Sequence, residues 1–369
     1  MARTGENIYK RKDGRWEGRF HIGRKENGRL RYGYIYGKSY MEVKKKIEPL
    51  RKKIALLAHY QVVGGLTYQQ WIDQWLLEMQ DTVKESTFSS YSYKINRYLL
   101  PQLAEISLHE INDAKLQELV QGWLDDGLSV SSIKIIVGLL SRSLKNAEQK
   151  GKIEKNPCSD LKLPKAAKKK IRSLSKREQK KLEKAAEKSK SSKALSAVLA
   201  LHTGMRIGEI AALKWENVLF DQNIIMVENT YQRLTMPKGH PTVMSYGSVK
   251  SNSSLRVIPM STKIREALEA RKKEANEEEY VFTVNGKPCE PRLLTFHFHQ
   301  LLKLAKLQNV HFHQLRHTFA TRCLESGADI PSVSALLGHA SSQMTLDVYS
   351  DSMLTQRVVA ISGMEKAIS

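Results

Sequence analysis

The chain has 369 residues, of which 41% are hydrophobic and 27% charged, a composition typical of a globular protein with two or three domains. No segment approaches the roughly 20 apolar residues of a membrane-spanning helix, and the basic N-terminal stretch lacks the apolar core of a secretory signal. The three cysteines, Cys158, Cys289 and Cys323, stand far apart, which argues against a disulfide framework. We therefore expect a cytoplasmic protein without a membrane partner.

The basic charge is large and local. Lysine and arginine outnumber aspartate and glutamate by 60 to 38, a net charge of +22. Residues 1–63 hold 17 basic against 6 acidic residues, and residues 164–193 hold 13 against 3. A solvated surface is the simpler explanation, but such concentration favours a nucleic acid, whose phosphates release counterions on binding. DNA is the expected partner.

The first segment reads as a small sheet. Residues 7–36 alternate basic with aromatic or aliphatic residues between the turn signals Asp13-Gly14 and Glu26-Asn27-Gly28, which predicts three strands. A basic helix over 40–53 follows. Such a module is too small for a large core, so a basic sheet face that binds DNA is favoured over an oligomerisation module.

Helical periodicity dominates after Gly64-Gly65. Thr67 caps the first of four predicted helices, the second stops near Pro101, the third follows Asn112-Asp113, and the fourth ends at Gly151. The tryptophans on these helices are predicted to form a core rather than to stack on bases. Asn156-Pro157 then opens a basic linker.

From about Leu174 the chain predicts an α-rich domain with a strand insertion. Strands are expected over 223–231, 243–250 and 255–259, with residues 232–244 left as an unassigned loop. The turn sequence Ser-Asn-Ser-Ser after Lys250 predicts that this lysine lies at a hairpin tip.

Four short segments contain candidate chemistry. In HTGMRIGEIAAL, Gly204 ends one helix and Arg206 begins the next, a place suited to an anion. In HQLRHTF, helical spacing puts His313, Arg316 and His317 opposite the apolar stripe of Leu315, Phe319 and Cys323. Two imidazoles and a guanidinium on one face could hold a phosphate and move a proton. LLGH ends at His339, and Tyr349 follows ten residues later.

Together these segments resemble the tyrosine recombinase (phage integrase) family. The match rests on H-x-L-R-H-T, L-L-G-H, the tyrosine ten residues beyond that histidine, and the upstream T-G-M-R-I-G-E-I-A-A-L-K-W. The resemblance covers almost the whole chain and is closest to integrases of temperate phages and conjugative transposons. It implies a multidomain, mainly α fold with small β-sheets. The expected parts are an arm-type DNA-binding domain (1–63), a helical core-binding domain (64–158), a basic linker (159–172) and a catalytic domain with a C-terminal tail (173–369).

The resemblance also implies a role for each site residue. Arg206 and Arg316 would clamp the scissile phosphate, and His339 would hydrogen-bond to it. Lys250 would protonate the leaving 5′-oxygen, His313 would assist proton transfer from the tyrosine, and Tyr349 would be the nucleophile. Glu209 would support the site, and His317 would be structural. The implied reaction integrates and excises a mobile element through a 3′-phosphotyrosine intermediate, without metal or ATP.

Several alternatives and partners complete the predictions. The histidines between 297 and 317 suggest zinc, but no cysteine or carboxylate stands at a ligand spacing, so neither a metal nor another cofactor is expected. A type IB-like topoisomerase and a non-catalytic DNA-binding protein are the rival functions. The family implies a homotetramer on double-stranded DNA with core-type and arm-type sites, an excisionase and a host DNA-bending protein. The C-terminal tail could pack on its own subunit or on a neighbour.

Overall fold

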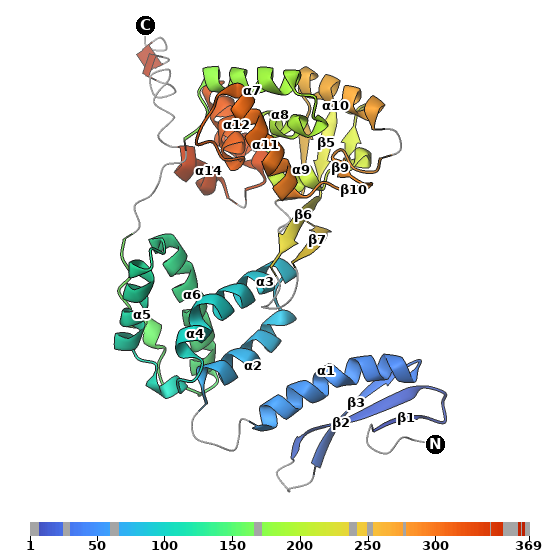
Figure 1. Ribbon diagram of the computed structural model, residues 1–369, viewed down its shortest axis with the longest axis vertical. Helices are drawn as coiled ribbons and strands as arrows, with labels where there is room; N and C mark the ends of the chain where they lie inside the picture. The colour runs from blue at the N-terminus through green and yellow to red at the C-terminus, as the bar shows by residue number, and fades with distance from the viewer. Residues whose placement is uncertain are drawn as a thin grey trace. The chain divides into compact units, whose positions relative to one another are not determined.

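The computed structural model describes residues 7–24, 30–59, 66–165, 172–235, 242–248, 254–275, 278–339, 341–349, 361–362 and 364–365. The chain divides into two compact units, Met1–Ala166 and Ala167–Ser369. Small antiparallel sheets accompany a predominance of helices, which confirms the predicted mainly α fold (Figure 1). No helix among the described residues is long and apolar enough to span a membrane.

The N-terminal part is a three-stranded antiparallel sheet with one helix, as predicted. The sheet comprises β1 (Ile8–Lys10), β2 (Trp16–Arg24) and β3 (Leu30–Gly37), in that order, and α1 (Tyr40–His59) lies across one face (Figure 1). A Cβ atom on Gly18 would come within 2.6 Å of Val43, so the missing side chain lets α1 approach the sheet. The helix is longer than the expected 40–53 range and passes through Pro49.

Four longer helices form the next core. They are α2 (Tyr68–Gln80), α3 (Glu85–Lys94), α5 (Asp113–Asp125) and α6 (Val130–Gln149). Thr67 caps α2 and Asn112 caps α5 through side-chain oxygens, as predicted. Trp71, Trp75 and Trp123 are buried in this core, which confirms their structural interpretation.

The helical run after α3 ends at Leu103, two residues beyond the predicted end near Pro101. The chain leaves α3 through a π-helical turn, η1 (Ile95–Leu99), and continues into α4 (Leu100–Leu103). Proline lacks the N–H that an interior helical position donates, but it is tolerated in a first turn. Pro101 lies in the first turn of α4, so the change of helix type at η1 accommodates it.

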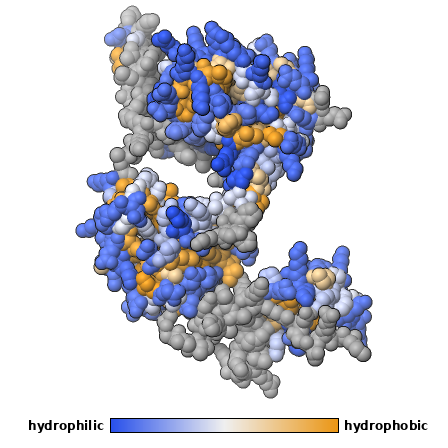
Figure 2. Space-filling model, in the orientation of Figure 1, coloured by the Kyte–Doolittle hydropathy of each residue, from blue (hydrophilic) through white to orange (hydrophobic). Residues whose placement is uncertain are grey.

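The second unit is built mainly of helices around one large apolar core. The helices are α7 (Lys176–Lys188), α8 (Leu195–Thr203), α9 (Ile207–Ala211), α10 (Thr262–Glu274), α11 (Pro291–Ala305), α12 (His313–Glu325), α13 (Ile330–Leu337) and α14 (Ser342–Tyr349). Buried side chains of α8, α9, α10, α11 and α12 meet in this core. The visible face over α7 and α10 is largely hydrophilic (Figure 2).

The strand insertion is present and is longer than predicted. Strands β4 (Val218–Leu219), β5 (Ile224–Val227) and β8 (Arg256–Pro259) form one antiparallel sheet. A separate hairpin pairs β6 (Asn229–Leu234) with β7 (Val243–Ser248), and β9 (Thr283–Val284) pairs with β10 (Lys287–Pro288). Residues 232–234, expected to be loop, therefore belong to β6, whereas β7 begins at Val243 as the predicted strand does. Cross-strand pairing overrides their weak local pattern.

Candidate active site

Arg206 lies where two helices of the second unit meet. Gly204 ends α8 with a φ of +65°, and a Cβ atom there would come within 2.6 Å of the Phe319 ring, so the position requires glycine. Arg206 then occupies the N-cap of α9, as predicted, and its backbone N–H donates to Glu209 Oε2 at 2.9 Å. Its side chain remains 38% exposed. The guanidinium is thus fixed at one end and accessible to an anion.

Glu209 is a buried bridge between two arginines. Its Oε1 accepts a hydrogen bond from Arg206 Nη1 at 2.7 Å, and its Oε2 accepts one from Arg256 Nη2 at 2.7 Å. Burial alone would raise the pKa of this carboxyl, but hydrogen bonds and positive charge from both arginines outweigh it and hold the pKa below its usual value. Glu209 therefore stays ionised and orients Arg206, which fits the supporting role inferred from sequence.

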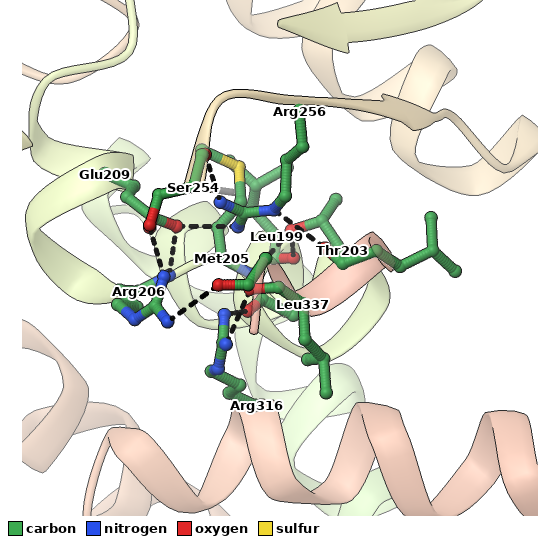
Figure 3. A network of polar contacts seen from close by, with 12 residues as sticks. Leu199, Thr203, Met205, Arg206, Glu209, Ser254, Arg256, Arg316 and Leu337 are labelled. Atoms are coloured by element: carbon green, nitrogen blue, oxygen red, sulfur yellow. Dashed lines mark hydrogen bonds and ion pairs between the residues drawn. The ribbon is translucent and has the colours of Figure 1, made fainter. Parts of the chain in front are cut away.

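Three guanidinium groups converge on the end of α13 (Figure 3). Arg256 Nε donates to the carbonyl of Leu336 at 2.7 Å, and Arg316 Nη2 donates to that of Leu337 at 2.6 Å. Arg206 Nη2 donates to the carbonyl of Gly338 at 3.4 Å. The last carbonyls of a helix lack intrahelical partners and carry partial negative charge, so three cations are stabilised there. This arginine cluster, Arg206, Arg256 and Arg316, holds the backbone that leads into His339.

Helix α12 contributes the second predicted arginine and two histidines. Arg316 is 3% exposed and also donates from Nη1 to the Gly204 carbonyl at 2.8 Å. The rings of His313 and His317 meet edge to face, with centroids 4.8 Å apart. Arg316 and His317 are both buried, although they lie opposite the apolar stripe of this helix. Arg316 donates to carbonyls at the ends of α8 and α13, which are distant in sequence, and helical periodicity does not reveal such contacts.

The histidines of the site are held neutral near pH 7. Burial, followed by the charges of His313 and Arg316, lowers the pKa of His317 to about 4. Partial desolvation and the positive charges of Arg316 and Arg206 lower the pKa of His313. Burial and the surrounding arginines lower the pKa of His339 to about 4. Neutral imidazoles can accept or donate a proton, as acid–base catalysis requires.

His339 follows α13 directly and contacts the next helix. Gly338 ends α13 in the left-handed conformation, with a φ of +65°. The backbone N–H of His339 donates to the Ser334 carbonyl, and its Nδ1 lies 2.8 Å from the hydroxyl of Thr345 on α14. The structure therefore brings Arg206, Glu209, Arg316 and His339 into one polar network, with His313 beside it.

The structure describes only the backbone of Tyr349 and nothing of Lys250, the remaining two candidates. Tyr349 is the last residue of α14, and its side chain lies outside what the structure describes. Lys250 lies outside the described residues altogether. Their roles therefore stay predictions.

Two residues of this network were missed in the sequence. Arg256 stands in a strand of alternating polarity, where an arginine resembles any exposed position, although its side chain is 4% exposed. Thr345 resembles an ordinary helical residue, although it is fully buried. The only sequence signal was position: Arg256 lies in the predicted hairpin segment, and Thr345 lies between His339 and Tyr349.

The phage integrase family model matches residues 172–355, the part of the chain that carries this network. A model for the N-terminal SAM-like domain of phage integrases matches residues 67–124. The tyrosine recombinase XerA of Pyrococcus furiosus is 30% identical over 59% of this chain and 69% of its own. The chain belongs to the phage integrase family. It is a tyrosine-type, site-specific DNA recombinase, as the motifs predicted.

Other relatives cover more of the chain. A XerC-like tyrosine recombinase of Caldanaerobacter subterraneus is 28% identical over 93% of this chain and 94% of its own. The Tn1549 transposon integrase, solved in complex with a circular intermediate DNA, superposes with a TM-score of 0.69 over 82% of this chain and all of that one, at 20% identity. A lambda integrase tetramer bound to a Holliday junction superposes with a TM-score of 0.59 over 91% of this chain and 96% of that one, at 21% identity. These superpositions confirm the fold.

Proposed function

We propose that this recombinase cuts and rejoins DNA with Arg206, Lys250, His313, Arg316, His339 and Tyr349, supported by Glu209. The hydroxyl of Tyr349 attacks the scissile phosphorus while His313 assists removal of its proton. The bond from phosphorus to the 5′-oxygen breaks, Lys250 protonates that oxygen, and a 3′-phosphotyrosine remains. The bond energy is conserved, so the 5′-hydroxyl of another strand can reverse the step without ATP.

The observation that carries the proposal is the convergence of Arg206 and Arg316 next to His339. A phosphoryl transition state spreads negative charge over its oxygens, and positioned guanidiniums stabilise it without a metal. Arg206 is anchored by Glu209 and Arg316 by two backbone carbonyls, so both groups are oriented before substrate arrives. Such preorganisation lowers the cost of reaching the transition state.

The test is covalent capture on a nicked duplex that carries the element's end. Cleavage next to the nick releases a short fragment and cannot reverse, so the protein stays attached. We expect a denaturant-resistant adduct with the wild-type chain, without metal or ATP, and none with Tyr349→Phe. Lys46→Ala, which removes a charge on α1 in the first unit, is the control and should cleave normally. Tight DNA binding without any adduct would refute the assignment and favour a non-catalytic DNA-binding protein.

We further propose that the open face of the N-terminal sheet binds arm-type DNA. Tyr9, Tyr34 and Tyr36 are among its exposed aromatic residues. The guanidinium of Arg19 lies 4.5 Å from the Tyr32 ring centroid, and Arg11 lies over Tyr36. Guanidinium groups that are held over tyrosine rings can contact the phosphates and base edges of a DNA groove. This basic aromatic face lies opposite α1.

Arg19→Ala tests this interface by salt dependence. Loss of one phosphate contact should weaken arm-type DNA binding and reduce the slope of log K against log salt by about 1. Lys46→Ala removes an equal charge on α1, the helix that covers the other face, and should leave the slope unchanged. Equal effects of the two variants would contradict a specific role of the open face.

The working assembly is proposed to be a homotetramer on two duplexes with core-type and arm-type sites, formed from free monomers. An excisionase and a host DNA-bending protein would set the direction of integration and excision of the mobile element. Recombination is favoured over simple relaxation because a separate arm-binding module helps to bridge two DNA segments. Exchange between two labelled sites, with no relaxation of a plasmid that lacks them, is the expected result.

A further inference from the structure

We infer that Thr345 is a positioning residue of the recombinase, which fixes the His339 ring and the start of the helix that carries Tyr349. Its side chain is fully buried, and its hydroxyl lies 2.8 Å from His339 Nδ1. A buried hydroxyl is costly unless it is hydrogen-bonded, so this contact has a structural reason to persist. The inference deepens the proposed function and rests on the phosphate-binding role of His339.

Other contacts fix the backbone of His339, so Thr345 determines only the orientation of its ring. The arginine cluster holds the carbonyls of residues 336–338, and the His339 backbone N–H donates to Ser334. The path of the backbone into His339 is thus determined by α13 and the cluster. Rotation about the side-chain bonds remains, and the Thr345 hydroxyl is the side-chain partner that the structure gives to this ring. A second-sphere partner of this kind selects both orientation and tautomer.

The tautomer follows from the chemistry of the phosphate. A neutral imidazole carries one proton, and a phosphate oxygen accepts hydrogen bonds but does not donate them. To bind the phosphate, His339 must carry its proton on Nε2, which leaves Nδ1 as an acceptor. The Thr345 hydroxyl then donates to Nδ1, a role that a threonine can perform and an aliphatic side chain cannot. Thr345 therefore keeps the donor of His339 directed away from α14.

The same contact ties the nucleophile to this histidine. Thr345 precedes Tyr349 by four residues, about one helical turn, on α14 (Ser342–Tyr349). Through Thr345, the helix of the tyrosine is anchored to the residue that binds the phosphate. For attack, the tyrosine oxygen and the phosphorus must lie a few ångströms apart and be aligned, so even a small displacement lowers the rate of cleavage.

Single-turnover cleavage of the nicked duplex tests this inference. Thr345→Val keeps the shape but removes the hydroxyl, and we expect cleavage to slow by about 10- to 100-fold, the usual cost of losing a partner that orients a catalytic ligand. Thr345→Ser retains the hydroxyl and should restore most of the rate. The DNA dissociation constant and the unfolding midpoint of each variant should stay near wild type. A Val variant that cleaves like wild type overturns the inference.

A double-mutant cycle separates positioning from general packing. If Thr345 acts through His339, then adding Thr345→Val to His339→Ala causes no further loss of rate. A merely structural role would slow the His339→Ala protein as much as it slows wild type, and that result also overturns the inference.

A spectroscopic arm is independent of activity. Imidazole nitrogen NMR of the protein without DNA should show the proton of His339 on Nε2 in wild type and in Thr345→Ser. In Thr345→Val, both tautomers should be populated. If wild type forms no adduct, the proposed function fails while this arm still tests the contact. If the Val variant shows the same tautomer as wild type, then Thr345 does not set the His339 ring, and the inference fails independently of the proposed function.

Discussion

The buried pair of Arg256 and Glu209 offers the sharpest test of the network. Their side chains are 4% and 3% exposed, and Arg256 also donates to the carbonyls of Leu336 and Ser254. Breaking a buried ion pair by removing one partner typically costs 3–5 kcal/mol. In the Arg256→Met variant, Glu209 retains its ion pair with Arg206. We therefore expect this change to lower the free energy of unfolding by about 3 kcal/mol, near the lower limit of that range.

The assay is denaturant and thermal unfolding of the full chain, followed by the transition of the second unit. For a unit of this size, about 3 kcal/mol corresponds to a drop in the midpoint temperature of roughly 6–12 °C. Lys176→Met is the matched control: it removes an equal charge from a 78% exposed side chain, 4.0 Å from Glu325, and should cost under about 1 kcal/mol.

Non-additivity provides a second criterion. Adding Glu209→Gln to Arg256→Met should cost less than the two single changes together, because the interaction between them is lost only once. A cost of Arg256→Met no greater than that of Lys176→Met would refute the reasoning. So would strict additivity of the two changes.

Three further changes have defined outcomes. Gly204→Ala combines a positive φ with a clash against Phe319, so it should destabilise the unit by about 1–2 kcal/mol more than Gly327→Ala, where φ is also positive but nothing lies within 4 Å; comparable midpoints would contradict this. Trp71→Ala removes a fully buried ring and should cost about 3–5 kcal/mol in thermal unfolding of the first unit, whereas a smaller loss would mean that the core collapses around it. Because the pKa of His339 is about 4 in the folded state, against roughly 6.5 unfolded, the unfolded chain binds more protons between these values. Its contribution to stability is present above about pH 6.5 and is lost as the pH falls toward 4, so His339→Asn should flatten the pH dependence of the urea midpoint in that window.

The parts of this site that belong to short sequence motifs could be predicted from the sequence. The glycine before Arg206, the histidine and arginine of α12, and the distance from His339 to Tyr349 all follow from short motifs. Of the two residues that were missed, Arg256 contacts Glu209 and Leu336, which lie far along the chain, and Thr345 on α14 contacts His339 in the turn after α13. Neither periodicity nor propensity encodes such contacts, since they depend on how elements pack.

The fold shows the same division. Capping residues, buried tryptophans and the three-stranded sheet were predictable because propensity and hydrophobic alternation agree there. The π-helical turn before Pro101 and the extra length of β6 were not, because helix type and cross-strand pairing depend on more than local preference. The burial of Arg316 on α12 was not predictable either, since burial of a guanidinium requires acceptors that only tertiary structure supplies.

The arginine cluster also constrains the order in which the protein can become active during synthesis. Its contacts to the end of α13 span 132 residues from Arg206, 80 from Arg256 and 21 from Arg316. Contacts of such sequence separation form late, after loop-closure entropy has been overcome. Until the ribosome has released residues 336–338, the first two arginines lack the α13 carbonyls that complete their orientation. A nascent chain can therefore complete its basic N-terminal module well before it has the means to cut.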